Sequence, residues 1–87
     1  MKIEVLGPGC ANCKKLGEDV NKTLAELKIE AEVVKITDIQ EFAKYGILMT
    51  PGLVINGKVY SSGKLPVIAT LKRWIEDEAN KDTQKQS

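Results

Sequence analysis

The sequence predicts a small α/β domain in which a four-stranded mixed sheet carries helices on both faces. Three observations support this fold class. Strand-like and helix-like segments follow one another in the order β-α-β-α-β-β-α, and the first β-α-β crossover requires two parallel strands. The dipeptide Asn56-Gly57 marks a later antiparallel hairpin, because both of its positions tolerate the positive φ of a type I′ turn. With 87 residues, the chain has room for one domain.

The first β-α-β unit lies within residues 2–36. Ile3 and Val5 alternate with other residues in a strand-like segment, and the run Gly7-Pro8-Gly9 then forces a sharp turn. Residues 31–36 are rich in Val and Ile and predict the second strand. Between the two strands, apolar residues at helical spacing predict an amphipathic helix, namely Leu16, Val20, Leu24 and Leu27.

The remaining elements lie in residues 38–79. The run Asp38-Ile39-Gln40-Glu41 has the form of a capping box and predicts a short helix that ends at Gly46. We expect Ile39, Phe42 and Ala43 to share the apolar face of this helix. The hairpin around Asn56-Gly57 comes next, and Pro66 suits the first turn of a closing helix. The closing helix has an apolar stripe of Val67, Ile68, Leu71, Trp74 and Ile75.

The end of the chain predicts a domain boundary. Apolar positions stop near Ala79, and residues 80–87 are polar without an apolar anchor. We therefore expect a domain over residues 1–79 and a flexible polar tail over residues 80–87.

The composition excludes several classes of function. Thirteen Lys and Arg against twelve Asp and Glu leave a formal charge of +1, so neither nucleic acid nor an anionic membrane is favoured as a partner. No apolar run approaches the ~20 residues that a membrane span requires. The segment Met1–Gly7 has a short apolar stretch with an acid inside it, which is not typical of a signal peptide. We expect a cytoplasmic, monomeric protein.

The chain has two cysteines, Cys10 and Cys13, in a C-x-x-C arrangement. A disulfide that closes so small a loop would add only about 2 kcal/mol to the free energy of unfolding by the chain-entropy relation, so a purely structural role is disfavoured. A reducing compartment also disfavours a resting structural disulfide. Redox exchange and metal binding are the two functional interpretations, and the alternative is a pair of ordinary buried small side chains.

A family resemblance follows from these motifs. Gly9-Cys10-Ala11-Asn12-Cys13 at the start of a helix, a later Thr50-Pro51, the hairpin and the closing helix together resemble the thioredoxin-like superfamily in its small, glutaredoxin-sized form. The most similar group is that of the small redox-active disulfide proteins, and the resemblance covers about residues 1–79. It implies a thiol–disulfide oxidoreductase that acts on protein disulfides and needs no cofactor besides the Cys10–Cys13 pair. A dithiol or a thioredoxin-reductase-like partner would supply the electrons.

The resemblance also implies roles for individual residues. Cys10 would be the attacking nucleophile and Cys13 the resolving thiol. We expect Cys10 at or just before the first helical residue, where unpaired backbone N–H groups favour its thiolate form. Thr50, Pro51 as a cis-proline, and Gly9 would face the substrate, with the backbone of Thr50 pairing with an extended peptide.

Glu4 is a further candidate site residue. It lies six residues before Cys10, the offset at which thioredoxins carry a buried acid that exchanges protons with the resolving thiol. The resemblance therefore makes Glu4 a candidate proton acceptor. The competing interpretation is a solvated carboxylate on a sheet face that carries only the short second helix.

Some residues depart from the family pattern. Gly9 stands where thioredoxins usually have Trp, and Ala11-Asn12 replaces their Gly-Pro. The run Ser61-Ser62-Gly63-Lys64 occupies the stretch in which glutaredoxins hold glutathione, so the reductant stays open.

Two other functions compete with the interpretation as an oxidoreductase. The first is a soft-metal chaperone or sensor that binds Cu(I) or Zn(II) through the same two thiolates, as heavy-metal-associated domains do. Those domains carry Met where Pro8 stands, and their element order is βαββαβ. The second is an inert adaptor, against which the intact cysteine pair argues.

Overall fold

The computed structural model of the chain describes residues 1–9 and 11–86, with the backbone alone for residues 82–86. Its elements follow the predicted order β-α-β-α-β-β-α. They are β1 (Lys2–Leu6), α1 (Ala11–Leu27), β2 (Glu32–Ile36), α2 (Ile39–Lys44), β3 (Gly52–Ile55), β4 (Lys58–Ser62) and α3 (Ile68–Gln86). None of the helices in the described residues has the length and hydrophobicity that a bilayer crossing requires.

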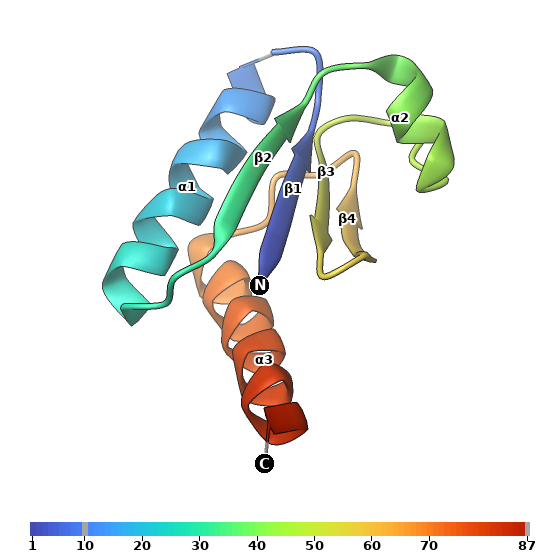
Figure 1. Cartoon of the computed structure of the whole chain (residues 1–87). Helices are drawn as coiled ribbons and strands as arrows, with labels where there is room; N and C mark the ends of the chain where they lie inside the picture. The colour runs from blue at the N-terminus through green and yellow to red at the C-terminus, as the bar shows by residue number, and fades with distance from the viewer. Residues whose placement is uncertain (10, 87) are drawn as a thin grey trace.

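The four strands form one mixed sheet in the order β2-β1-β3-β4, which confirms the predicted fold class. β1 runs parallel to β2 and antiparallel to β3, and β3 and β4 form the antiparallel hairpin. Leu6 at the end of β1 lies opposite Gly52 at the start of β3. The β1–α1 connection and the loop before β3 therefore lie at the same end of the sheet (Figure 1).

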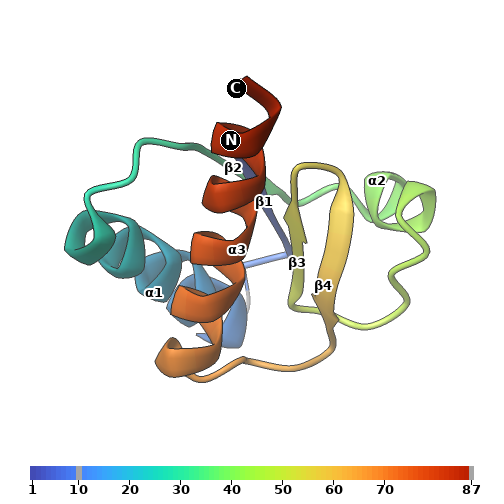
Figure 2. The same cartoon turned by 90° about the horizontal axis from the view of Figure 1, so that it is seen from below.

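Helices cover both faces of the sheet, as predicted. α1 and α3 lie side by side on one face (Figure 2). Their core cluster contains Ile3, Val5, Leu16, Val20, Leu24, Leu53, Ile55, Leu71 and Ile75. The opposite face carries α2 and a smaller cluster of Leu6, Phe42, Ile47 and Val54. Successive strand residues point to opposite faces, so β1 contributes to both clusters.

The short helix α2 differs in part from its prediction. The Asp38 side chain accepts a hydrogen bond from the Gln40 N–H at 2.9 Å, and Gly46 ends the helix region with a φ of 71°. Of the predicted apolar face, Phe42 alone is buried, and the predictions for Ile39 and Ala43 are wrong. A helix of six residues turns less than twice, so it presents one large side chain to the sheet and leaves Ile39 73% exposed.

The closing helix also differs from its prediction. α3 continues to Gln86 instead of ending near Ala79, and Ser87 lies outside the described residues. No Gly or Pro follows Ala79 to stop the helix, and Lys81 pairs with Glu78 one turn earlier at 3.2 Å. Within the predicted stripe, Leu71 and Ile75 are fully buried, whereas Val67 and Ile68 are exposed because they precede the part of α3 that packs on the sheet.

Glu78 is a buried carboxylate that joins α3 to the hairpin. Its side chain accepts hydrogen bonds from the Tyr60 hydroxyl and from Asn56 Nδ2 at 3.2 Å, and it pairs with Lys58 at 3.6 Å and Lys81 at 3.2 Å. Burial alone would raise the pKa of Glu78, but these hydrogen bonds and the Lys58 charge outweigh it and lower the pKa to about 2. Burial and the hydrogen bond to Glu78 raise the pKa of Tyr60 to about 12.

The Glu78 contacts predict an acid-sensitive contribution to stability. The folded-state pKa of Glu78 is about 2, below its ordinary value of 4.5, so the contribution is complete above pH 4.5 and is lost as the pH falls toward 2. The pKa difference corresponds to about 3 kcal/mol. Urea denaturation of Glu78→Gln should show a flatter dependence of the unfolding free energy on pH in this window. Glu76→Gln, an exposed neighbour, is the control, and equal slopes in both variants would contradict the assignment.

Candidate active site

Cys13 lies in the first turn of α1, where it is 6% exposed. It is disulfide-bonded. Cys10, the predicted nucleophile, lies outside the described residues, and in sequence it directly precedes Ala11, the first residue of α1. Cys13, for which the resemblance implies the role of resolving thiol, is therefore a buried residue near the start of α1.

Gly7 brings Cys13 close to the end of β1. A Cβ added at Gly7 would lie 2.2 Å from Cys13 Sγ, 2.8 Å from Cys13 Cβ and 3.9 Å from Thr50 Cβ. The Gly7 N–H donates a hydrogen bond to the Ile36 carbonyl at 2.9 Å, which fixes this backbone between β1 and β2. Cys13 and Thr50 thus both lie close to one buried glycine. From the sequence, Gly7 is expected only as a turn residue. A single sequence does not distinguish a glycine needed for a turn from one needed for close packing.

Thr50 and Pro51 lie in the loop that leads into β3. The peptide bond between them, for which the resemblance implies the cis form, is cis. Pro51 is buried and its carbonyl accepts a hydrogen bond from the Gly63 N–H at 2.9 Å, which ties the loop to the end of β4. Thr50 is half-buried, and the preceding Leu48 and Met49 are 93% and 66% exposed. The loop therefore exposes two apolar side chains directly before Thr50 and the cis peptide bond.

Gly9 lies at the open side of this site. Its φ is +98°, a left-handed conformation that favours glycine, and a Cβ built there would have none of the described residues within 4 Å apart from its chain neighbour. Pro8 and Gly9 are both exposed. The space around Gly9 is open, so a partner molecule has room to approach the start of α1 from this direction.

Glu4 is buried on the α2 face of the sheet. It is 5% exposed, and its neighbours Ile3 and Val5 point to the face that carries α1 and α3. The Tyr45 hydroxyl donates a hydrogen bond to Glu4 Oε2 at 2.7 Å. The interpretation of Glu4 as a solvated carboxylate is therefore wrong, because Tyr45 at the end of α2 covers it. The helix α1, which carries Cys13, packs on the opposite face.

Tyr45 contacts the candidate site residue Glu4, and the sequence gives no sign of this contact. The hydrogen bond to Glu4, followed by burial and the nearby charges of Glu4 and Glu41, raises the pKa of Tyr45. No local motif indicates this contact, because it joins residues 41 positions apart.

Tyr45→Phe tests whether this contact supports the fold. Removal of the hydroxyl leaves the buried carboxylate of Glu4 without this donor, so we expect a loss of about 1–3 kcal/mol in the free energy of unfolding at neutral pH. Urea denaturation measures the change. The double variant Glu4→Gln/Tyr45→Phe should lose less than the sum of the two single variants. Additive losses would show that the two side chains act independently.

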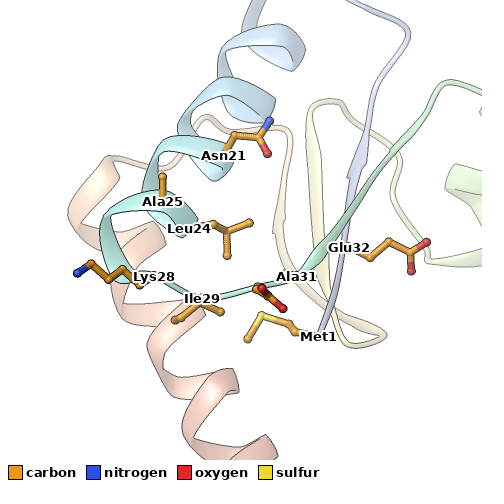
Figure 3. Close-up of a pocket in the computed structure, with 9 residues that line it drawn as sticks. Met1, Asn21, Leu24, Ala25, Lys28, Ile29, Ala31 and Glu32 are labelled. Atoms are coloured by element: carbon orange, nitrogen blue, oxygen red, sulfur yellow. The ribbon is translucent and has the colours of Figure 1, made fainter.

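Two cavities differ in their relation to Cys13. A cavity of about 130 Å³ is lined in part by Cys13, Gly7 and Gly9. A broader depression of about 950 Å³ lies at the other end of α1, around Met1, Leu24 and Ile29 (Figure 3). Cys13 lines the smaller cavity and does not line this depression.

Known proteins resemble this chain over most of its length. A family model described as a thioredoxin domain matches residues 1–76, a range that includes Glu4, Gly7, Cys13, Thr50 and Pro51. A protein named thioredoxin from Methanocaldococcus jannaschii is 37% identical over 74 residues, which cover 85% of this chain and 85% of that protein. A second protein of that name, from Methanothermobacter thermautotrophicus, is 33% identical over 75 residues, which cover 86% of this chain and 97% of that protein.

Proposed function

Because the chain belongs to the thioredoxin superfamily, we propose that it is a thiol–disulfide oxidoreductase that acts on protein disulfides through Cys10 and Cys13. The main support for the proposal is the state and the position of Cys13. Cys13 is disulfide-bonded in the first turn of α1, and the sequence contains one other cysteine, three positions earlier. The general activity of the superfamily, thiol–disulfide exchange, needs a cysteine pair of this kind.

The start of α1 supports Cys10 as the nucleophile. Cys10 directly precedes the helix, and the N–H groups of the first turn have no partner within the helix. Their partial positive charge favours a thiolate over a thiol. The thiolate of Cys10 attacks one sulfur of the client disulfide, and the client's other sulfur leaves and takes up a proton. A mixed disulfide then joins Cys10 to the client.

Cys13 completes the exchange. After losing its proton, it attacks the Cys10 sulfur, so that a Cys10–Cys13 disulfide forms and the client leaves with its second thiol. Two electrons pass from the protein to the client. The close fit of Cys13 over Gly7 supports this role, because it keeps the resolving sulfur buried. The space around Gly9 leaves room for the client. We retain Glu4 as a candidate proton acceptor, because its carboxylate is buried and positioned by Tyr45.

The loop before β3 supports a protein client. Thr50 and Cys13 both lie close to Gly7. The exposed Leu48 and Met49 add an apolar surface directly before Thr50. An extended peptide that pairs with the Thr50 backbone would place its own disulfide over the start of α1. We further propose that a dithiol or a thioredoxin-reductase-like partner returns the electrons and that the protein works in the cytoplasm.

The fold gives no support to the soft-metal alternative. Heavy-metal-associated domains have the order βαββαβ, whereas this chain has β-α-β-α-β-β-α with a closing helix. The same two cysteines would serve in either function, so a direct test has to separate them.

A trapping experiment makes this separation. Reduced Cys13→Ser, incubated with insulin as the disulfide substrate, should form a discrete mixed disulfide through Cys10 that intact-mass spectrometry detects and dithiothreitol releases. Cys10→Ser under the same conditions should not accumulate such a species. The absence of a Cys10 adduct, together with tight stoichiometric Cu(I) binding by the wild type and no turnover, would favour the metal chaperone.

A further inference from the structure

The small cavity beside Cys13 opens on the β2 side of the site. Its volume of about 130 Å³ is several times what one water molecule needs, so a group of several heavy atoms fits. The walls are mainly apolar. Apart from Cys13 and the two glycines, Gly7 and Gly9, the lining residues are Val5, Lys14, Lys35 and Thr37.

Two lysines give this cavity a positive charge. Lys14 follows Cys13 in α1, and Lys35 lies opposite Val5 on β2, which directs it to the α1 face of the sheet. A Cβ added at Gly17 would lie 3.6 Å from Lys35 Cε, so the Lys35 side chain runs along the surface of α1.

Among the described residues, neither lysine forms an ion pair with an acid. The ion pairs found within the described part of the chain involve Lys15, Lys44, Lys58, Lys72 and Lys81, and not Lys14 or Lys35. Among the described residues, no Asp or Glu lines the cavity. Two uncompensated ammonium groups beside a partly apolar cavity suit a short hydrocarbon chain that ends in an anion.

We propose that this cavity binds the carboxylate-bearing end of a low-molecular-weight disulfide, which the Cys10–Cys13 pair reduces to two thiols. The inference rests on the proposed function of that pair. In this proposal the carboxylate pairs with Lys14 and Lys35, and the methylene groups lie against Val5 and Gly7, all of which line the cavity. This arrangement places the disulfide of the small molecule beside the start of α1.

The reaction balances without another co-reactant. The Cys10 thiolate forms a bond to one sulfur of the small disulfide, whose S–S bond breaks and releases one thiolate that takes up a proton from solvent. Cys13 then loses its proton and bonds to the Cys10 sulfur, which releases the second small thiol. The protein dithiol is oxidised by two electrons and the small disulfide is reduced by two.

Three disulfides of similar size but different charge test the proposal. The fully reduced protein is mixed with dithiodipropionate (anionic), hydroxyethyl disulfide (neutral) or cystamine (cationic), and its oxidation is followed by alkylation and mass spectrometry. Each rate constant is divided by that of dithiothreitol with the same disulfide, which removes the intrinsic effect of substrate charge. At low salt the normalised rate for the anion should exceed that for the cation by at least about tenfold, and the ratio should shrink at high salt.

Substitution of the two lysines tests whether the preference for the anionic disulfide arises in the cavity. Lys14→Gln/Lys35→Gln should bring the ratio of anion to cation close to one and leave the normalised rate for hydroxyethyl disulfide within about twofold of the wild type. Lys22→Gln, an exposed lysine on α1 that does not line the cavity, should keep the wild-type ratio.

The outcomes separate the inference from the function on which it rests. If the protein reduces none of the three disulfides, the proposed function fails. If it reduces all three at equal normalised rates, or if the double variant keeps the anion preference, the oxidoreductase function stands and the anion site is overturned.

Discussion

Cys10→Ser should reduce the rate of insulin reduction by several orders of magnitude, to that of dithiothreitol alone. A serine hydroxyl cannot form the mixed disulfide through which the exchange proceeds, so no later step can compensate. The measurement is the turbidity of insulin reduced by dithiothreitol with a catalytic amount of protein. Retention of more than about a tenth of the wild-type rate would show that Cys10 is not the attacking thiol.

A stability measurement accompanies this variant. The loop closed by a C-x-x-C bridge is small, so its loss should lower the unfolding free energy of the oxidised protein by no more than about 2 kcal/mol. Cys10→Ser and Cys13→Ser should therefore both remain folded at room temperature, and circular dichroism checks this. Loss of activity in a folded Cys10→Ser protein then reports on the chemistry rather than on the fold.

Gly7→Ala should lower both the stability and the activity of the protein. The added Cβ would lie 2.2 Å from Cys13 Sγ and 2.8 Å from Cys13 Cβ. Neither side can move freely, because the Gly7 N–H is bonded to Ile36 and Cys13 Cβ is fixed by the first turn of α1. We expect a loss of about 2–3 kcal/mol in the unfolding free energy. We also expect a fall of more than about tenfold in insulin reduction, since α1 must shift away from β1.

Gly17→Ala is the matched control for Gly7→Ala. Both glycines are buried, but a Cβ at Gly17 would meet Lys35 Cε at 3.6 Å, an ordinary van der Waals distance. Because Gly17 lies within α1, alanine should raise the unfolding free energy by about 0.5–1 kcal/mol and leave insulin reduction unchanged. Equal stability of the two alanine variants would contradict the close packing of Cys13 over Gly7.

Local patterns predict most of this fold. Asn56 and Gly57 have φ values of 51° and 82°, as the type I′ turn requires, because this turn is determined by the two residues that form it. The parallel pairing of β1 and β2 follows from chain geometry, since a helix between two strands returns the chain to the same end of the sheet. The turn depends on two neighbouring residues, and the parallel pairing depends on the order of the elements, so both can be recognised in a single sequence.

The parts that were not predicted depend on how the helices pack against the sheet. Tyr45 and Glu4 meet only because α2 folds over the end of β1, and Gly7 meets Cys13 only because α1 packs against that strand. The extension of α3 past Ala79 reflects a continuous run of residues that tolerate a helix, which a pattern based on apolar positions does not detect.

The central claim is that Cys10 and Cys13 exchange two electrons as one pair. The most direct measurement is a redox titration of the protein in buffers of oxidised and reduced dithiothreitol, with free thiols alkylated and counted by mass spectrometry. We expect both thiols to disappear together in one transition, with a tenfold change in the ratio of oxidised to reduced protein for about every 30 mV and no change in subunit number. Two thiols that titrate separately, or that form disulfides only between different chains, would contradict this mechanism.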